Sequence, residues 1–439
     1  MIGAAFWLAA DAAQCFRAIG LDASQVAALN RQRLGESLRH AAFATDFYRW
    51  RLEEAGTSWN DPILEREPYQ ALAAVPPVTK QELRQRGVRV LAGGKVRPGW
   101  HSSFSSGSTS VPFRVYYDPR AWATLKYLVK LRARQACGLR PTDRVAIVDA
   151  APARRLSTWG RVLRSRRISV LLPGSTVAGE LAAFNPSVVC GLPSALAEAA
   201  SELRLRGERL RLRAVFTTGE LLSQTTRALL AAAFQAPVRD VYGTSETKEI
   251  GWECPYGGMH LNSDVVHLEV LDDQGRSLPV GEEGNLVVTS LVNRAMPLIR
   301  YITGDRGALL SGTCRCGRST PLLGVVAGRS ADVLVLRGGQ RISPYVLDCA
   351  VERIQGVMRY QISQLDPVKV RVRAILEQTA SREAVARELR STLRADVAPF
   401  LDVEVEFVDH LPTGPNGKFR VVEPLGGAVP ASSFPMEVL

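Results

Sequence analysis

The chain has 439 residues, 46% of them hydrophobic and 22% charged, a length and composition that exclude a fibrous or disordered protein and allow two or more domains. The net charge of +12 permits nucleic-acid binding, but only seven of the 55 basic residues are lysines and no basic tract exists, which favours a solvated arginine-rich surface over an RNA-binding function. Residues 1–12 are mostly apolar but lack the basic start of a signal peptide, and no apolar run reaches the roughly 18 residues of a membrane span, so a cytoplasmic protein is expected.

The first third of the chain is predicted to be mostly helical. Helical periodicity over 25–55 ends at Gly56, and a second helix start lies within 76–95, where Pro76 and Pro77 precede Thr79-Lys80-Gln81-Glu82. Residues 113–117 favour a strand, and a helix is expected over 119–137.

Short apolar runs then alternate with helical ones, which predicts a parallel sheet with crossover helices. Ligands bind at the strand ends of such sheets. The expected strands are 145–149, 168–172, 188–190, 214–217 and 238–242, and the expected helices are 194–206 and 224–234.

The pattern becomes β-rich from residue 261, with strands expected over 267–272 and 284–291 around a turn. Strand 333–336 and a helix over 344–354 begin another unit, and the end of the chain reads as strand 370–376, helix 381–397 and strand 403–408. The predicted class is α/β. A multi-layered N-terminal domain over 1–330 has mostly parallel sheets and a β-rich subdomain, and a small α+β domain covers 331–439.

Residues 103–118 contain a run of small hydroxyl residues around Gly107. Such a run folds back so that backbone N–H groups and hydroxyls converge, as a polyphosphate requires. There is no Gly-Lys pair, so this is not a Walker A loop. An ordinary flexible loop is the alternative.

Other stretches also suggest ligand binding. Thr217-Thr218-Gly219-Glu220 and Tyr242-Gly243-Thr244-Ser245-Glu246 each follow an expected strand, so both belong at the carboxyl edge of the sheet. Asp305 offers a carboxylate for a ribose diol, and Lys418 is a scarce lysine in a Gly-rich turn. Each stretch alone is also compatible with a surface turn or a buried hydrogen-bonding residue.

In order and spacing, these stretches resemble the adenylate-forming superfamily, which includes acyl-CoA synthetases and peptide-synthetase adenylation domains. Within it, the chain is similar to the branch of phenylacetate-CoA ligase and the capsular CapK proteins, from about residue 30 to 425. Branch features are Pro77 to Lys80, Gly191 to Ser194, Glu253-Cys254 with His260, and Cys314 to Arg318.

The resemblance implies an ATP site with a role for each matching residue. Asp305 would bind the ribose hydroxyls with help from Arg329, Glu246 would ligate Mg²⁺, and Lys418 would be the mobile catalytic lysine. The remaining nucleotide contacts would be Ser105, Ser106, Gly107, Ser108 and Thr109 around the β- and γ-phosphates, Gly219 and Glu220 on the adenine side, Tyr242 and Gly243 near the base, and Thr244 near the α-phosphate.

The implied function is ATP-dependent activation of a small, aromatic carboxylic acid to acyl-AMP and transfer to coenzyme A, with the C-terminal domain swinging about a hinge near Ala331 between the two steps. Transfer to an amine or a carrier-protein thiol is the alternative within the superfamily. A non-catalytic nucleotide-binding or assembly protein is the alternative of another class. Ser110 and Val111 replace the usual Gly-Lys after the loop threonine, and Ala331 stands where a hinge Asp is common.

Cys254, His260, Cys314 and Cys316 form a chemically separate set. Three thiolates and an imidazole would make a closed, structural zinc site, because no position is left for water. Spacing alone leaves buried free thiols equally open, and the resemblance favours zinc.

Overall fold

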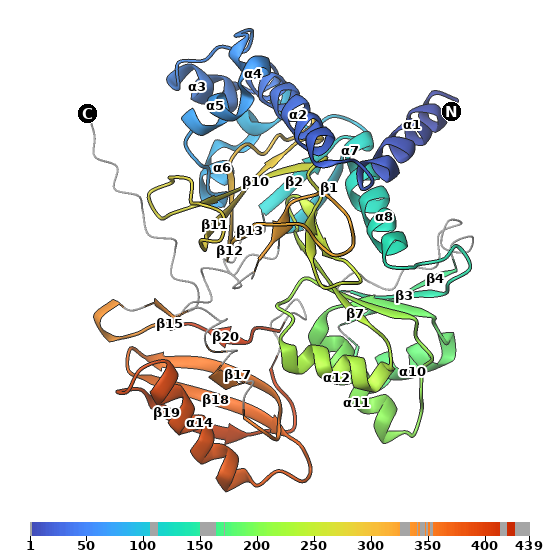
Figure 1. Cartoon of the computed structure of the whole chain (residues 1–439), viewed down its shortest axis with the longest axis vertical. Helices are drawn as coiled ribbons and strands as arrows, with labels where there is room; N and C mark the ends of the chain where they lie inside the picture. The colour runs from blue at the N-terminus through green and yellow to red at the C-terminus, as the bar shows by residue number, and fades with distance from the viewer. Residues whose placement is uncertain are drawn as a thin grey trace. The chain divides into compact units, whose positions relative to one another are not determined.

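The structure is a computed structural model that forms two compact units (Figure 1). The first comprises Met1–Gly138 and Val241–Val326, and the second comprises Leu139–Asp240 and Ala327–Leu439. The residues described are 2–105, 113–149, 164–170, 172–324, 334–339, 341–342, 347, 350–351, 354–412 and 419–425.

The N-terminal part of the first unit is helical, as predicted, but the single helix expected over 25–55 is wrong. The first helix ends before Thr45, whose backbone is extended (φ −126°, ψ 134°). The Thr45 hydroxyl then caps the next helix by accepting a hydrogen bond from the Tyr48 N–H. The helices are α1 (Ile2–Ala18), α2 (Ala23–Ala44), α3 (Asp46–Glu54), α4 (Ile63–Arg66), α5 (Pro68–Ala74) and α6 (Lys80–Arg86), followed by the 3₁₀ turns Gly87–Val90 and Ala92–Gly94.

An antiparallel hairpin of β1 (His101–Ser105) and β2 (Phe113–Tyr117) follows, with Ser105 opposite Phe113 near the turn and His101 opposite Tyr117 at the far end. Asp118 caps the next helix by accepting from two backbone N–H groups, as its Asp-Pro sequence suggests. That helix is not uniform, because a π-helical turn, Thr124–Leu128, separates α7 (Pro119–Ala123) from α8 (Val129–Ala136).

The rest of the first unit is antiparallel, which confirms the predicted β-rich region. One group has the order β13-β14-β9-β8-β7, and a separate sheet has the order β10-β11-β12. Strand β7 begins in the second unit and ends in the first. The strands are β7 (Val238–Thr244), β8 (Lys248–Glu253), β9 (Met259–Leu261), β10 (Val266–Leu271), β11 (Gly284–Ser290), β12 (Tyr301–Gly307), β13 (Leu309–Leu310) and β14 (Leu322–Leu323).

The second unit contains the predicted parallel strands in the order β6-β5-β3-β4, with three helices beside them (Figure 1). Apolar residues such as Val148, Val189 and Leu196 are fully buried between strands and helices. The strand expected over 168–172 lies earlier, and α10 was not predicted. The elements are β3 (Val145–Asp149), β4 (Ser165–Ser169), β5 (Val188–Gly191), β6 (Ala214–Thr218), α10 (Gly174–Phe184), α11 (Pro193–Leu205) and α12 (Gln224–Phe234).

The end of the chain forms an α+β segment with its own core, as predicted. Its sheet has the order β19-β18-β17-β20, and Leu389 and Leu393 of α14 are buried against Val370 and Val372 of β18. The elements are β15 (Leu334–Val335), β16 (Arg341–Ile342), β17 (Val357–Asp366), β18 (Lys369–Leu376), α14 (Arg382–Asp396), β19 (Asp402–Phe407) and β20 (Val422–Glu423). The helix expected over 344–354 lies mostly outside the described residues.

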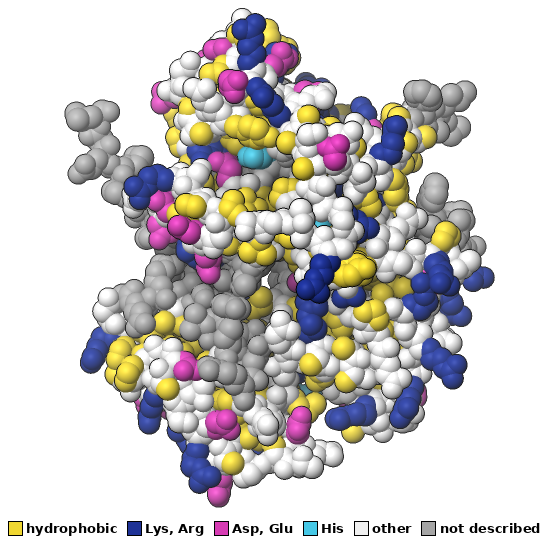
Figure 2. Space-filling model, in the orientation of Figure 1, with side chains coloured by type: hydrophobic (Ala, Val, Ile, Leu, Met, Phe, Trp, Pro, Cys, Tyr) yellow, Lys and Arg dark blue, Asp and Glu magenta, His cyan; other side chains and the backbone are white. Residues whose placement is uncertain are grey.

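The predicted domain boundary near residue 330 stays a prediction, because residues 325–333 are outside the described ranges. In the part of the chain that is described, no helix is long and apolar enough to cross a membrane. On the face drawn in Figure 2, lysine and arginine side chains occur over the whole face, among many uncharged ones, and are most frequent at the lower right. That distribution is typical of a solvated surface.

Candidate active site

The carboxyl end of β7 carries three of the predicted nucleotide residues. The Tyr242 hydroxyl donates a hydrogen bond of 2.9 Å to Oδ2 of Asp305 on β12. The predicted base-side ring and the predicted ribose carboxylate are therefore in contact. Gly243 is required here, because a Cβ at this position would lie 2.3 Å from the Lys248 carbonyl oxygen. Thr244 Oγ1 accepts from the Thr247 N–H at 3.1 Å, which orders the turn into β8.

Glu246 lies in that turn as a buried, ionised carboxylate. Its Oε1 is 2.8 Å from Lys80 Nζ and accepts a hydrogen bond of 3.1 Å from the Tyr301 hydroxyl. The Tyr117 hydroxyl lies 2.7 Å from the backbone carbonyl of Glu246 and holds the turn in place. Burial alone would raise the pKa of Glu246, but the Lys80 ammonium more than offsets this and the pKa lies below its usual value.

Lys80 is a residue of this site to which the sequence assigned no role, although it lies at a predicted helix start and in the branch feature Pro77 to Lys80. Its scarcity could have singled it out, since only seven lysines occur among 55 basic residues. The Glu246 carboxylate has the hard oxygen chemistry that Mg²⁺ prefers. Because Lys80 and Tyr301 already contact Oε1, a bound Mg²⁺ would share or displace the lysine contact.

The predicted adenine-side residues lie in the second unit. The Glu220 carboxylate accepts hydrogen bonds from the Ser194 N–H at 3.0 Å, from the Ser194 hydroxyl at 2.9 Å and from the Phe419 N–H at 2.6 Å. Burial raises the pKa of Glu220, and these donors partly counteract it. Gly219 has φ +85°, a conformation that favours glycine, and a Cβ there would lie 3.0 Å from Leu192.

Several predicted residues fall outside the described ranges: Ser106, Gly107, Ser108, Thr109, Arg329 and Lys418. Ser105 belongs to the described backbone of β1. Phe419, which follows Lys418 in sequence, is the residue whose N–H binds Glu220. The roles of all these residues stay predictions from the resemblance.

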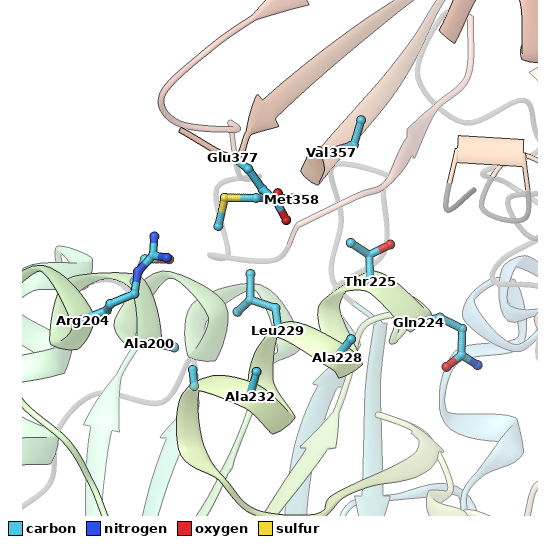
Figure 3. A pocket seen from close by; sticks show the side chains of 12 residues that line it. Ala200, Arg204, Gln224, Thr225, Ala228, Leu229, Ala232, Val357, Met358 and Glu377 are labelled. Atoms are coloured by element: carbon cyan, nitrogen blue, oxygen red, sulfur yellow. The ribbon is translucent and has the colours of Figure 1, made fainter. Parts of the chain in front are cut away.

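A wide hollow of about 1180 Å³ also lies in the second unit, away from these residues (Figure 3). Its walls come from α11 and α12 on one side and from the ends of β17 and β18 on the other. Leu229 and Ala228 of α12 project toward the side that carries Met358 (Figure 3). Most of the lining is apolar, and none of the predicted site residues contributes to it.

The four predicted zinc ligands come together in the first unit. The ligand atoms of Cys254, His260, Cys314 and Cys316 all lie within 4.8 Å of one another. Cys254 Sγ is 3.5 Å from Cys314 Sγ, and Cys316 Sγ is 3.1 Å from His260 Nε2. His260 Nδ1 is 2.9 Å from Thr320 Oγ1, which fixes the ring with Nε2 toward the thiols.

This donor set fits a tetrahedral zinc ion. Three sulfurs and one imidazole nitrogen match a closed structural site. Gly258 permits the approach, because a Cβ there would lie 2.9 Å from Cys314 Sγ. The strands β9 and β14 pair directly, with His260 opposite Leu322, so the two halves of the set are brought together by the sheet although 54 residues separate His260 from Cys314 in sequence.

The chain was compared with known proteins, and the matches agree on one family. A model of the CapK C-terminal domain matches residues 334–424. Phenylacetate-coenzyme A ligase of Thermus thermophilus is 30% identical over 336 residues, covering 72% of this chain and 73% of the relative. The enzyme of the same name from Escherichia coli is 26% identical over 426 residues, covering 91% of this chain and 95% of the relative.

Solved structures show the same fold. A 2-hydroxyisobutyryl-CoA ligase in the postadenylation state superposes with a TM-score of 0.76 at 22% identity, covering 93% of this chain and 91% of that chain. The same enzyme in complex with its acyl-AMP and CoA has a TM-score of 0.62 at 22% identity. The fold is thus that of an adenylate-forming ligase. Within that class, the chain belongs to the phenylacetate-coenzyme A ligase family, as the sequence motifs predicted.

Proposed function

We propose that this protein activates a small aromatic carboxylic acid with ATP and transfers the acyl group to coenzyme A. The observation that carries the proposal is the contact between Tyr242 and Asp305, next to Thr244 and Glu246, in a chain of this family. A ring that faces a nucleobase and a carboxylate that binds a ribose diol must be neighbours, and these two residues are 2.9 Å apart.

In the first step, a carboxylate oxygen of the acid attacks the α-phosphorus of ATP, the bond to the β-phosphate oxygen breaks, and pyrophosphate leaves. Both reactants are anions, so the site must offset their repulsion. Thr244 hydrogen-bonds the α-phosphate, and Lys418 bridges the carboxylate and α-phosphate oxygens. Lys80 holds Glu246 ionised and in place, because its Nζ lies 2.8 Å from Oε1.

Mg²⁺, when bound at Glu246, would neutralise phosphate charge. In the second step, the thiolate of coenzyme A attacks the acyl carbon, a thioester bond forms and AMP leaves. The thiol proton passes to solvent. An amine nucleophile would give an amide and AMP by the same displacement, so the acceptor assay must include both.

The test is acid-dependent exchange of labelled pyrophosphate into ATP across aryl, hydroxyaryl and fatty acids, with the Lys418→Ala variant in parallel. We expect exchange with an aryl acid and a loss of at least 100-fold in Lys418→Ala, because one charge-stabilising donor contributes about that much in a dry site. Lys369→Ala, which removes a half-buried lysine paired with Glu404, is the matched control and should keep full exchange.

Measurable ATP binding without exchange for any acid would contradict the proposal and support a non-catalytic nucleotide-binding protein. If exchange occurs and a product forms with an amine but not with coenzyme A, the adenylation step is supported and the acceptor of the acyl group is an amine.

We also propose that Cys254, His260, Cys314 and Cys316 hold a structural zinc ion. The clustering of their ligand atoms within 4.8 Å supports it, since buried free thiols have no need to converge on an imidazole.

A further inference from the structure

The Glu220 carboxylate joins two segments of the second unit that lie about 200 positions apart in sequence. On one side it binds Ser194, in the first turn of α11: Oε2 accepts from the Ser194 N–H at 3.0 Å and Oε1 from the Ser194 hydroxyl at 2.9 Å. On the other side, Oε1 accepts from the Phe419 N–H at 2.6 Å. The N-terminus of a helix stabilises a buried carboxylate, so Glu220 is held in one orientation. Both of its oxygens are therefore engaged by groups of the chain itself.

The segment that begins with Phe419 is also attached to the C-terminal sheet. The next residue is held by a side chain of β17, because Gln361 Nε2 donates to the Arg420 carbonyl oxygen at 3.1 Å. The parallel pairing of β20 with β17 continues this attachment. Phe419 is thus fixed by Glu220 and by the sheet together. Consecutive Cα atoms are about 3.8 Å apart, so these two anchors also limit where the backbone of Lys418 can lie.

Arg359 of β17 contributes a buried cation to the same contact. Its guanidinium carbon lies 5.3 Å from the centroid of the Phe419 ring, a distance at which the ring attracts a cation. Burial lowers the pKa of Arg359, and the Glu220 and Glu198 carboxylates oppose that effect. In turn, Arg359 is one of the groups that counteract the rise that burial causes in the pKa of Glu220. Each charge offsets the burial of the other, so removing Arg359 would weaken the hold on both Glu220 and Phe419.

We infer that Glu220 and Arg359 are positioning residues, which fix the Phe419 backbone and thereby place Lys418 for the attack of the acid on ATP. The inference rests on the proposed function, in which Lys418 acts in the first step and takes no part in the attack of the acceptor on acyl-AMP. The resemblance places Glu220 on the adenine side. One carboxylate would therefore link the nucleotide side of the site to the segment that follows the lysine.

The test measures the two steps separately in Arg359→Met, with an acid that supports exchange. Pyrophosphate exchange reports the first step, and thioester formation from synthetic acyl-AMP and coenzyme A reports the second. We expect kcat of exchange to fall by about 10- to 100-fold, since a misplacement of about 1 Å costs up to that much. The KM for ATP should change less than about threefold, because Arg359 acts through Lys418 and not on the nucleotide. An unchanged rate of thioester formation would show that the variant is folded.

Three further variants separate positioning from a general loss of stability. Arg359→Lys keeps the cation and should recover part of the lost exchange rate. Arg359→Met combined with Glu220→Gln should lose no more than the more impaired single variant, because both changes weaken one contact. Arg371→Met removes an arginine that pairs with Glu404 at 3.0 Å on the neighbouring strands of the same sheet, and it should keep the wild-type rates of both steps.

Unchanged exchange in Arg359→Met, equal losses in the two steps, or losses that multiply in the double variant would overturn the inference. If the acceptor is an amine, the second step is followed with that amine. If no acid supports exchange, the proposed function fails, and hydrogen exchange of the Phe419 amide decides whether Glu220 anchors it. At least tenfold faster exchange of that amide in Glu220→Ala than in wild type would support the anchor, and an equal rate would refute it.

Discussion

Arg132 shows how single charges hold the first unit together. Its side chain is 1% exposed, and both terminal nitrogens bind the Asp264 carboxylate. The same nitrogens donate to the Cys15 carbonyl and to Asn262 Oδ1, both at 2.9 Å. One guanidinium on α8 therefore joins α1 to the loop before β10. Such a pair contributes little net stability when intact but is costly to break, because one buried charge remains.

Asp264→Asn should lower the free energy of unfolding by about 3–5 kcal/mol at pH 7, since Arg132 would keep its charge without a counter-ion. Urea unfolding followed by tryptophan fluorescence measures this, because six of the seven tryptophans lie in the first unit. Glu67→Gln, at an exposed pair with Arg31 in the same unit, is the control and should cost under about 1 kcal/mol. Equal losses in the two variants would contradict the account.

The difference in the free energy of unfolding between wild type and Asp264→Asn should depend on pH, because the pKa of Asp264 differs between the folded and unfolded states. Burial would raise the pKa of Asp264, but Arg132 holds it below the usual value. A depressed pKa stabilises the fold above the unfolded pKa of about 3.9, and this contribution is lost as the pH falls through the folded pKa. The gap between wild type and Asp264→Asn should therefore narrow below about pH 4.

Individual residues could be predicted where a motif marks them. Tyr242, Asp305 and the zinc ligands were named from the sequence, and the structure brings Tyr242 to Asp305 and gathers the four ligands. The roles of Lys80 and Arg132 were not predicted, because they depend on partners more than 100 positions away. Sequence spacing carries no information about such pairs, except that a scarce lysine invites attention.

At the scale of elements, the pairing of β9 with β14 determines the proposed zinc site. Protein purified without added metal should contain about one zinc per chain, and Cys314→Ser should lose it and unfold at a lower temperature. Elemental analysis and thermal unfolding with and without a chelator measure both effects. Cys137→Ser, which changes a thiol outside the cluster, should keep the metal. Wild-type protein with no zinc above background would remove the proposal.

Helices and strands were predicted best where the hydrophobic periodicity agrees with the residues that mark the beginning and end of an element. The parallel strands β3, β5 and β6 and helix α12 were recognised because short apolar runs alternate with helical ones. The break at Thr45 was missed, since helical periodicity continues across it and only the capping hydroxyl marks a new start. The π-helical turn Thr124–Leu128 has no sequence signature of its own.

For the whole molecule, the main question is whether the C-terminal segment is an independent domain. Among the described residues, its core cluster runs from Leu334 to Val422 and includes fully buried Leu389. A fragment of residues 331–439 should therefore fold alone and unfold cooperatively in urea by circular dichroism. Leu389→Ala should cost about 2–5 kcal/mol, and exposed Arg387→Ala should have little effect. An unfolded wild-type fragment would contradict the predicted boundary near 330.

The α/β class and the family were predictable for the whole molecule, because strand and helix alternation and ordered motifs are properties of the sequence. The division of the chain into two compact units could not be predicted. The first unit joins residues 1–138 to 241–326, and helices at the start of the chain pack with strands more than 200 positions later, as Asn30 of α2 does with Val266 of β10. Such long-range packing is specified by shape complementarity, which a pattern of residue types does not show.

The uneven use of lysine and arginine also makes this protein a natural reporter for chemical labelling. Amine-reactive reagents ignore guanidinium groups, and two of the seven lysines, Lys80 and Lys248, lie at the turn that carries Glu246. Burial, with repulsion from neighbouring ammonium groups, lowers the pKa of Lys248 to about 7. An amine with a pKa of about 7 is about half uncharged at pH 7, whereas an ordinary lysine is almost fully protonated, so Lys248 would react with a small reagent before ordinary surface lysines do. Mass spectrometry of the labelled peptides would therefore follow occupancy of the site directly, with exposed Lys95 as an internal standard.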